Sequence, residues 1–121
     1  MERMQNKPTI SIIVPALNEE KNIRGAIANV LDGLGDFGVK GEVIIVNDGS
    51  IDKTEELVRQ AMEKNNQVRM IKHDKPLGIG ASFWDGVDDA DGDIVVMLPG
   101  DNENDSREIF RYLGLLGEVD I

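Results

Sequence analysis

The chain has 121 residues and a mass of 13.3 kDa, and its 13 basic and 23 acidic side chains give a formal net charge of −10 at pH 7. This length and a hydrophobic fraction of 40% are typical of one folded domain, residues 1–121, and exclude a disordered chain. The acidity argues against a nucleic-acid-binding surface, and the absence of cysteine excludes disulfides, thiolate metal sites and cysteine nucleophiles.

The first part of the chain predicts a strand followed by a long helix. Residues 10–14 form an Ile- and Val-rich run, which is typical of a strand buried on both faces of a parallel sheet. Apolar residues then recur at helical spacing over 23–34. Asn18 is the predicted N-cap of this helix, and Glu19 and Glu20 are expected in its first turn, where the helix dipole favours negative charge.

The middle of the chain repeats this pattern. Residues 43–46 predict a second buried strand. Asp52 is expected to cap the next helix, with Glu55 reaching back to its start, and this helix continues through Met62. A weaker strand is predicted at 67–71.

A third helix is predicted at 80–88 and a further buried strand at 94–98. Within this helix Phe83, Trp84 and Val87 are predicted to be core residues. These residues are therefore assigned no role in binding a ligand.

The end of the chain predicts one more helix and the start of a fifth strand. Asp105 and Glu108 repeat the capping pattern. The helix that follows them is expected to run through Ile109, Leu113 and Leu116. Residues 119–121 open the fifth strand.

Strands that alternate with helices in this order predict an α/β fold, a Rossmann-like α/β/α arrangement of three layers with a mainly parallel sheet and right-handed crossovers. Ligands of such sheets bind outside the carboxyl ends of the strands. The residues that directly follow each strand are therefore the candidates for a functional site.

The turn after the first strand, residues 15–20 (PALNEE), carries no glycine. Dinucleotide-binding folds place G-x-G-x-x-G there, so binding of NAD is disfavoured. Residues 78–80 (GIG) come after the third strand, and Phe83 stands where a third glycine would be. Taken alone, this segment is typical of a flexible approach to a helix.

Two acidic turns follow the second and fourth strands, at 47–50 (NDGS) and 99–105 (PGDNEND). They bring carboxylates to one edge of the predicted sheet. Each of them alone also fits a structural interpretation, as a common Asp-Gly turn or a helix cap. The acidic residues at 85, 88, 89, 91 and 93 likewise fit a solvated face before the fourth strand. His73, the only histidine, is expected to be a surface residue.

Taken together, four segments in one order and spacing resemble the family 2 glycosyltransferases. These segments are residues 11–20 (SIIVPALNEE), 43–54 (VIIVNDGSIDKT), 78–81 (GIGA) and 92–97 (GDIVVM). The resemblance covers residues 9–110 and is greatest to the dolichyl- or polyprenyl-phosphate mannosyltransferase-like branch. It implies a fold of the GT-A type, that of nucleotide-diphospho-sugar transferases. The chain would be the N-terminal, nucleotide-sugar-binding half of that fold and therefore a truncated version of it.

The resemblance implies nucleotide-binding residues one by one. The first turn of the family lies against the base and ribose, and the residues that match it here are Pro15, Ala16, Leu17 and Glu19. Asp48 would accept hydrogen bonds from the base or ribose. Gly78 and Gly80 would allow the backbone to approach the nucleotide closely.

The family's D-x-D element binds a divalent metal that bridges the two phosphates, which makes Mg²⁺ or Mn²⁺ the implied cofactor. Asp101 matches its second Asp, and Glu103 stands where this branch often has another oxygen ligand. A hard cation there neutralises the departing nucleoside diphosphate. Pro99 replaces the first Asp and cannot ligate a metal, so metal affinity or dependence is expected to differ from the family's norm.

The implied activity is transfer of a sugar from a nucleoside-diphosphate sugar to an acceptor. GDP-mannose is the leading donor and UDP-glucose the next, and a polyprenyl or dolichyl phosphate is the expected acceptor. The carboxylate that deprotonates the acceptor lies in a half of the family's fold that this chain lacks. No catalytic residue is therefore assigned, and the isolated chain is expected to be inactive.

A cytoplasmic protein is expected, because no apolar run approaches the roughly 20 residues of a spanning helix and the N-terminus lacks the apolar core of a signal peptide. A lipid acceptor would bring a longer parent protein to a membrane. An open sheet edge left by truncation also makes self-association plausible.

Two alternatives stay open. One is a non-catalytic module that binds a nucleotide sugar or a partner protein, which Pro99 and the missing second half favour. The other is a phosphorylation-dependent receiver domain of similar length and element order. That class needs a phosphoacceptor Asp after the third strand, where this chain has residues 72–75 (KHDK), so it is disfavoured.

Overall fold

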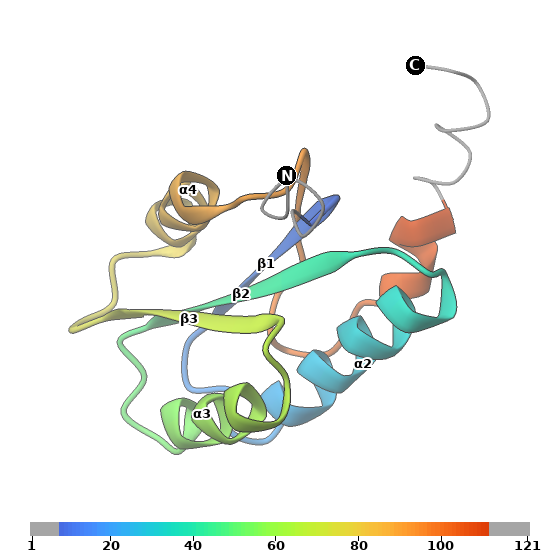
Figure 1. Cartoon of the computed structure of the whole chain (residues 1–121). Coiled ribbons are helices and arrows are strands. Elements are labelled where there is room, and N and C mark those ends of the chain that lie inside the picture. The colour runs from blue at the N-terminus through green and yellow to red at the C-terminus, as the bar shows by residue number, and fades with distance from the viewer. Residues whose placement is uncertain (1–7, 112–121) are drawn as a thin grey trace.

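The computed structural model describes residues 8–111, in which strands alternate with helices (Figure 1). Its elements in chain order are β1 (Ile10–Ala16), α2 (Ile23–Asp36), β2 (Gly41–Asp48), α3 (Thr54–Lys64), β3 (Val68–His73), α4 (Ile79–Asp89) and β4 (Ile94–Met97). Residues 106–111 are also helical. Within 8–111, no helix combines the length and apolar character that a bilayer span requires.

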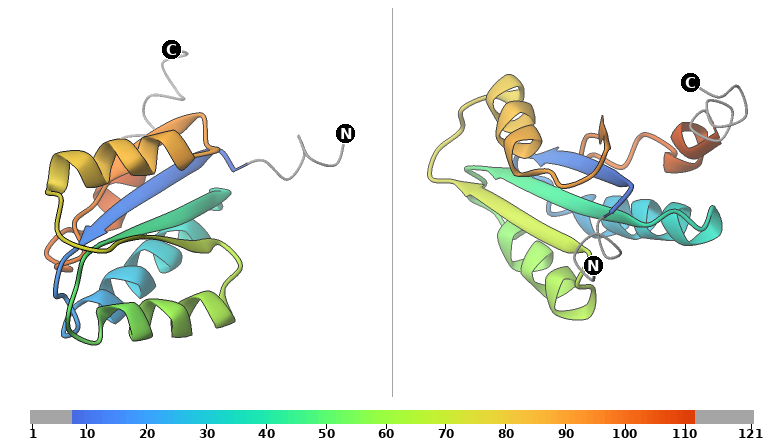
Figure 2. Two further views of the ribbon diagram at one scale, coloured as in Figure 1. Left: turned by 90° about the vertical axis from the view of Figure 1, so that its left-hand side faces the viewer. Right: turned by 45° about the horizontal axis from the view of Figure 1, so that its top comes forward.

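The four strands form one parallel sheet in the order β3-β2-β1-β4. Helix α4 covers one face of the sheet, and α2 and α3 cover the other (Figures 1 and 2). This arrangement confirms the predicted three-layer α/β fold. The register pairs Ala16 with Asn47 and Asp48 with His73, so β1, β2 and β3 end side by side.

The two central strands are buried on both faces, as their apolar runs with little polar alternation predict. Every residue of β1 and of β2 is buried. Side-chain alternation divides the core into two clusters. Ile12 and Ile45 belong to the larger cluster, which includes α2 and α3 residues, whereas Ile13 and Ile44 pack with Phe83 of α4.

The predicted cap of the first helix is wrong. Asn22 occupies the N-cap of α2, and no acidic residue lies in the first turn. Asn18 instead lies in the preceding loop with φ of 54°, in the left-handed region. Its side chain contacts the next loop, so a tertiary contact replaces local capping.

The predicted capping pattern of α3 is wrong. Lys53 occupies the N-cap and makes no capping side-chain hydrogen bond, whereas Asp52 lies one residue earlier and accepts a hydrogen bond at Oδ1 from the backbone N–H of Thr54 at 2.9 Å. Glu55 does not reach back to Asp52. It forms ion pairs with Arg59 at 3.1 Å and Lys72 at 2.8 Å. These cations on α3 and β3 give the carboxylate a stronger interaction than a backbone amide offers.

At the helical residues 106–111, the predicted cap is confirmed for Asp105. Asp105 Oδ1 accepts a hydrogen bond from the backbone N–H of Arg107 at 3.0 Å, at the start of the helical residues 106–111. Glu108 pairs with Arg111 at 2.8 Å. Three predicted features lie outside the described residues: Leu113, Leu116 and the strand at 119–121.

Candidate functional site

The connections that follow β1, β2 and β3 lie on the same side of the sheet (Figure 1). Parallel strands place their carboxyl ends at one edge, and this is the edge where such sheets bind ligands. Pro15 and Ala16 are the buried last residues of β1, and Asp48 ends β2. Leu17 directly follows β1 and is 44% exposed. The structure thus brings the predicted residues of two turns to one edge.

Hydrogen bonds join the loop after β1 to the loop after β2. The backbone N–H of Asn18 donates to Ser50 Oγ at 2.9 Å, and Asn18 Oδ1 accepts from the backbone N–H of Ile51 at 2.9 Å. The backbone N–H of Glu19 donates to Thr54 Oγ1 at 2.9 Å. The predicted nucleotide-binding turn is therefore held by the first residues after β2.

A second pair of contacts completes this junction. The backbone N–H of Glu20 donates to Asp52 Oδ2 at 3.1 Å, and the backbone N–H of Lys53 donates to Glu20 Oε2 at 3.3 Å. Burial alone would raise the pKa of Asp52, but the hydrogen bonds from Thr54 and Glu20 outweigh it and lower the pKa. Asp52 is therefore an ionised structural acceptor.

Asp48 is engaged by the segment that leads into α4. Its Oδ1 accepts the backbone N–H of Leu77 at 2.8 Å, and its Oδ2 accepts that of Gly78 at 3.0 Å. Burial would raise the pKa of this carboxyl, but hydrogen bonds from His73, Leu77 and Gly78 lower it instead. The carboxylate that the resemblance assigns to the nucleotide thus also positions the predicted Gly78 segment.

Two glycines are required where this segment meets β2. Gly49 has φ of +77°, and a Cβ there would lie 2.5 Å from the carbonyl carbon of Lys75. Gly78 has φ of +102° and immediately precedes α4. Left-handed backbone and close packing both favour glycine. Gly80 lies in the first turn of α4, where a Cβ would meet nothing within 4 Å, so its predicted closeness to a nucleotide stays a prediction.

The prediction that His73 is a surface residue is wrong. Its side chain is 8% exposed, and both ring nitrogens contact carboxylates. Nδ1 lies 2.8 Å from Asp48 Oδ1, and Nε2 lies 2.6 Å from Asp85 Oδ2 of α4. The hydrogen bond with Asp48 raises the pKa of His73, burial lowers it, and the contact with Asp85 raises it further, so the net shift is upward.

The prediction of a core position is wrong for Trp84, whose side chain is 63% exposed. Phe83 and Val87 do pack against the smaller core cluster, as predicted. The rings of Phe83 and Trp84 meet edge to face, with centroids 5.3 Å apart. Adjacent residues of a helix point about 100° apart, so one apolar neighbour can be buried while the other faces outward.

The acidic turn after β4 is attached to the end of β1. The backbone N–H of Gly100 donates to the carbonyl oxygen of Pro15 at 3.0 Å. A Cβ at Gly100 would lie 3.1 Å from Ile23 Cδ1 and 3.2 Å from Ala16 Cβ, so only a small residue fits here without displacing its neighbours. This contact brings Asp101 to the same edge as the turn after β1.

Asp101 and Glu103 lie on one short turn, in which Asp101 Oδ1 accepts the backbone N–H of Glu103 at 3.0 Å. Within residues 8–111, no group of three or more acidic or histidine side chains is arranged to hold a metal. Mg²⁺ is commonly held by one or two carboxylates together with substrate phosphates. The donor chemistry of this turn therefore fits a divalent cation that shares its coordination with a diphosphate.

A different acidic cluster lies at the opposite, amino end of the sheet. Glu42 is 8% exposed and accepts hydrogen bonds from Ser11 Oγ, from Arg69 and from the backbone N–H of Asp91. Arg69 also pairs with Asp89. Burial would raise the pKa of Glu42, but these hydrogen bonds lower it. Asp89 and Asp91, two of the residues predicted to form a solvated face, have side chains that are 48% and 71% exposed, as predicted, although Asp89 also pairs with Arg69.

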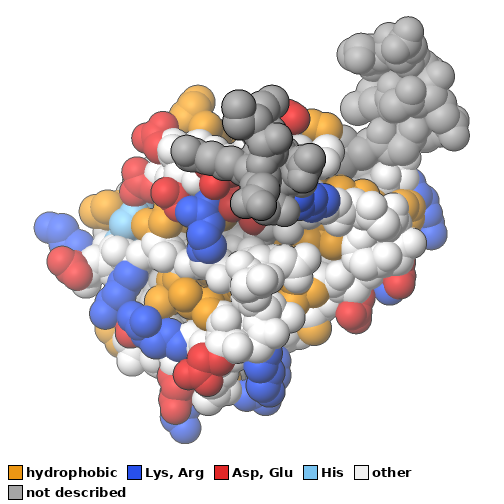
Figure 3. Space-filling model, in the orientation of Figure 1, with side chains coloured by type: hydrophobic (Ala, Val, Ile, Leu, Met, Phe, Trp, Pro, Cys, Tyr) orange, Lys and Arg blue, Asp and Glu red, His pale blue; other side chains and the backbone are white. Residues whose placement is uncertain are grey.

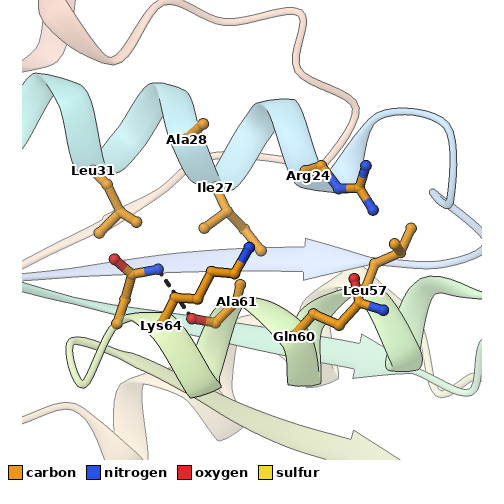
Figure 4. Close-up of a pocket in the computed structure, with 9 residues that line it drawn as sticks. Arg24, Ile27, Ala28, Leu31, Leu57, Gln60, Ala61 and Lys64 are labelled. Carbon is orange, nitrogen blue, oxygen red and sulfur yellow. Dashed lines mark hydrogen bonds between the residues drawn. The ribbon is translucent and has the colours of Figure 1, made fainter.

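A cavity lies away from the candidate edge, between α2 and α3. Its volume is about 390 Å³, and none of the predicted nucleotide-binding residues lines it (Figure 4).

Acidic and basic side chains are interspersed over the face shown in Figure 3. The net charge of −10 is therefore not gathered into one acidic surface on that face.

Residue-by-residue interpretation of the sequence missed the contacts of His73 and Asp85. One signal was present, because His73 ends β3 and therefore stands at the ligand-binding edge of a parallel sheet. The partner Asp85 is twelve residues further along the chain, and helical geometry alone does not show that it points back to β3.

Two buried polar atoms in the described structure, Asn47 Nδ2 and Ser82 Oγ, have no hydrogen-bond partner.

The three-layer parallel sheet, with its joined loops and acidic turn at the carboxyl edge, defines a Rossmann-like α/β domain with a candidate ligand site at that edge. The model of the family described as glycosyl transferase family 2 matches residues 11–118. The chain belongs to this family.

Curated relatives are similar over most of this chain. An uncharacterized glycosyltransferase of Synechocystis sp. is 32% identical over 104 residues, which cover 86% of this chain and 32% of that protein. The undecaprenyl-phosphate 4-deoxy-4-formamido-L-arabinose transferase of Proteus mirabilis is 27% identical over 110 residues, which cover 90% of this chain and 34% of that protein. The chain thus spans about a third of the length of these relatives.

Solved structures show the same fold. The mannosyltransferase PcManGT from Pyrobaculum calidifontis, in complex with GDP-Man and Mn²⁺, gives a TM-score of 0.78 at 24% identity over 91% of this chain and 32% of that one. Glucosyl-3-phosphoglycerate synthase from Mycobacterium tuberculosis, in complex with UDP, gives 0.62 at 30% identity over 83% of this chain and 36% of that one. These similarities confirm the GT-A fold.

Proposed function

We propose that this chain is the donor-binding part of a glycosyltransferase that transfers a sugar from a nucleoside-diphosphate sugar. The observation that carries the proposal is the hydrogen-bonded junction of the loops after β1 and β2, with Asp101 attached to the same edge through Gly100 and Pro15. This edge presents the residues that match the family's nucleotide-binding motifs. The similar proteins from Pyrobaculum and Mycobacterium were solved with GDP-Man and with UDP, which supports a nucleotide-sugar donor.

In the proposed site, the exposed Leu17 and the hydrogen-bonded turn around Glu19 would receive the base and ribose. Asp48 and Gly78 would form the adjacent wall, since their hydrogen bond fixes one against the other. Asp101 and Glu103 would hold Mg²⁺ or Mn²⁺. Such an ion, when bound, stabilises the negative charge of the departing diphosphate.

The proposal extends to donor and acceptor classes. GDP-mannose is the first candidate donor and UDP-glucose the second. The acceptor is proposed to be a polyprenyl phosphate, which the undecaprenyl-phosphate transferase of Proteus mirabilis supports. An acceptor of this kind would bring a longer parent protein to a membrane surface, with this domain on its cytoplasmic side.

The edge strand β4 supports a proposal of self-association. It is four residues long, it pairs with β1 on one side, and no pairing on its other side exists within the described residues. Ile94 and Met97 are exposed on it. The unpaired backbone groups of an open edge can pair with a second chain.

A second candidate function is a non-catalytic module that binds a nucleotide sugar. Pro99 favours it, because proline offers no side-chain ligand at the first position of the metal-binding motif. Sugar transfer by a longer parent protein, abolished by Asp101→Ala, would reject this alternative.

Calorimetric titration tests the proposed function. GDP, UDP, GDP-mannose and UDP-glucose are titrated with and without Mn²⁺ into the wild-type chain, Asp101→Ala and the control Asp88→Ala, which removes an exposed carboxylate from α4. We expect metal-dependent binding of one nucleotide that Asp101→Ala weakens at least tenfold, since a metal ligand is lost. Absence of binding by the wild-type chain, or equal affinities in both variants, would reject the proposed site.

A further inference from the structure

His73 joins β3 to both β2 and α4 through charged groups at the carboxyl edge of the sheet, as Arg69 does at the opposite end through Glu42 and Asp89. Its Nδ1 contacts Asp48 of β2 at 2.8 Å, and its Nε2 contacts Asp85 of α4 at 2.6 Å. A neutral imidazole has one N–H donor, whereas the imidazolium ion has two. Two carboxylates on the two nitrogens therefore match the protonated ring.

The same carboxylate continues the connection to the backbone. Asp48 accepts hydrogen bonds from the N–H groups of Leu77 and Gly78, directly before α4 begins at Ile79. Gly49, next to Asp48, packs against the backbone of Lys75. Protonated His73 thus lies at the centre of a connection that contacts α4 at two places, through Asp48 at the residues directly before the helix and through Asp85 within it.

Loss of the proton removes one of the two donors. Asp48 keeps its two backbone donors, whereas His73 is the hydrogen-bond partner of Asp85 within residues 8–111. Of the two contacts of His73, the one with Asp85 is therefore the one that breaks when the proton is lost. Helix α4 then keeps only the pair of Asp89 with Arg69 as a charged connection to β3 within the described residues, and the Gly78 segment loses one of its supports.

We propose that protonated His73 is a positioning residue for nucleotide binding, which holds the Gly78 segment in place through Asp48 and the following helix α4 through Asp85. This inference rests on the proposed function of the edge. The nucleotide affinity of the protein is then highest when His73 is protonated, and it declines as His73 loses its proton.

The charged groups near the His73 ring come from β2, α4, β3 and the loop after β3. Asp48 from β2 and Asp85 from α4 contact it directly. Lys72 precedes it in β3 but pairs with Glu55 of α3, on the other face of the sheet. Asp74 and Lys75 follow in the loop and are exposed.

The first part of the test uses the ligand-free chain. The ring signals of His73 and the backbone amide of Gly78 are followed by NMR from about pH 6 to about pH 9.5, a range that begins near the ordinary histidine pKa of about 6.5. We expect the Gly78 amide to titrate together with the ring in the wild type and in the control Asp88→Asn. In Asp85→Asn the shared midpoint moves to lower pH, because a negative charge beside the ring is removed. A Gly78 amide whose chemical shift does not change as the ring titrates would overturn the proposal.

The second part measures affinity for GDP and UDP over the same pH range, with Mg²⁺ present. His73→Asn keeps one side-chain donor and has no titration of its own. The phosphates of the nucleotide titrate equally whether the wild-type chain or His73→Asn is measured. The ratio of the wild-type affinity to the His73→Asn affinity therefore isolates the effect of His73. We expect this ratio to fall by about fivefold or more from low to high pH, within the usual range of coupling between sites.

The two possible failures are distinguishable. A constant ratio of affinities, with nucleotide bound at every pH, would overturn the positioning role and leave the proposed function standing. If neither protein binds nucleotide at any pH, the proposed function fails, and the positioning role fails with it. Circular dichroism of both variants identifies a variant that has not folded, and Asp85→Asn then replaces His73→Asn in the ratio because its side chain is 46% exposed and outside the core.

Discussion

Asn18 Oδ1 accepts a hydrogen bond from the backbone N–H of Ile51 at 2.9 Å, which joins the loops after β1 and β2 across 33 residues of sequence. Asn18 adopts φ of 54° to make this contact, in a region that asparagine tolerates better than most residues. The shape of the proposed nucleotide-binding turn therefore depends on the next loop as well as on its own residues.

Replacement of Asn18 by alanine should destabilise the protein. The substitution removes the hydrogen bond to Ile51 and places a residue with lower left-handed preference at φ of 54°. The expected loss is about 1–2 kcal/mol in the free energy of unfolding, measured by urea denaturation. Asn18→Gly separates the causes, because glycine adopts this φ without strain and loses only the hydrogen bond. If both variants keep wild-type stability, the connection between the loops contributes nothing.

Thr54 supplies the central hydroxyl of the same junction. It is completely buried, donates to Asp52 and accepts the backbone N–H of Glu19. Thr54→Val keeps the shape but leaves a buried amide without an acceptor, so we expect a loss of about 1–3 kcal/mol in urea denaturation. Thr54→Ser keeps the hydroxyl and should lose less. A valine variant as stable as the serine variant would contradict this role of the hydroxyl.

Gly49 should tolerate no side chain. It combines φ of +77° with a Cβ position 2.5 Å from the backbone of Lys75. We expect Gly49→Ala to lower the free energy of unfolding by more than about 1 kcal/mol. Gly35 is the matched control, since nothing lies within 4 Å of its Cβ position in α2, and Gly35→Ala should be neutral or stabilising by up to about 1 kcal/mol. Equal effects of the two substitutions would contradict this assignment.

The sequence patterns predict the architecture well because burial on both faces of a parallel sheet leaves a clear signal. The apolar runs of β1 and β2, with little polar alternation, and the spacing in α2 come directly from this requirement. Helix starts are predicted less well. Asn18 and Glu55 are good local capping residues, but Ile51 and Lys72 offer them tertiary partners that sequence spacing does not show.

The same distinction applies to the candidate site. Motifs place Asp48, Gly78 and Asp101 at one edge, because they follow strands of a parallel sheet. The role of His73 is different, since it depends on Asp85 pointing from α4 back to β3. Such a contact between two elements is a property of packing, and it becomes visible only in three dimensions.

Stability should depend on pH in two opposite ways. The pKa of His73 is raised in the folded chain, so its contribution is full below the unfolded value of about 6.5 and is lost as pH rises through the folded pKa. The pKa values of Asp48 and Glu42 are lowered, so their contributions are full above the ordinary range of about 4 and are lost as pH falls through their folded values.

Urea denaturation over a pH series measures this dependence. We expect the free energy of unfolding to decline in acid and, separately, in mild alkali. His73→Asn should abolish the decline on the alkaline side and keep the decline in acid, because Glu42 and its partners are unchanged. An alkaline decline of the same size in His73→Asn would assign that decline to another group.

The most direct measurement of the proposed site is NMR mapping of the described backbone amides during titration with GDP and UDP in the presence of Mg²⁺. If the carboxyl edge binds the nucleotide, the largest shift changes will fall on Leu17, Ser50, Gly78 and Asp101. Shift changes centred on Leu31, Ala61 and Lys64 in the cavity between α2 and α3, or no changes at saturating nucleotide, would contradict a donor site at this edge.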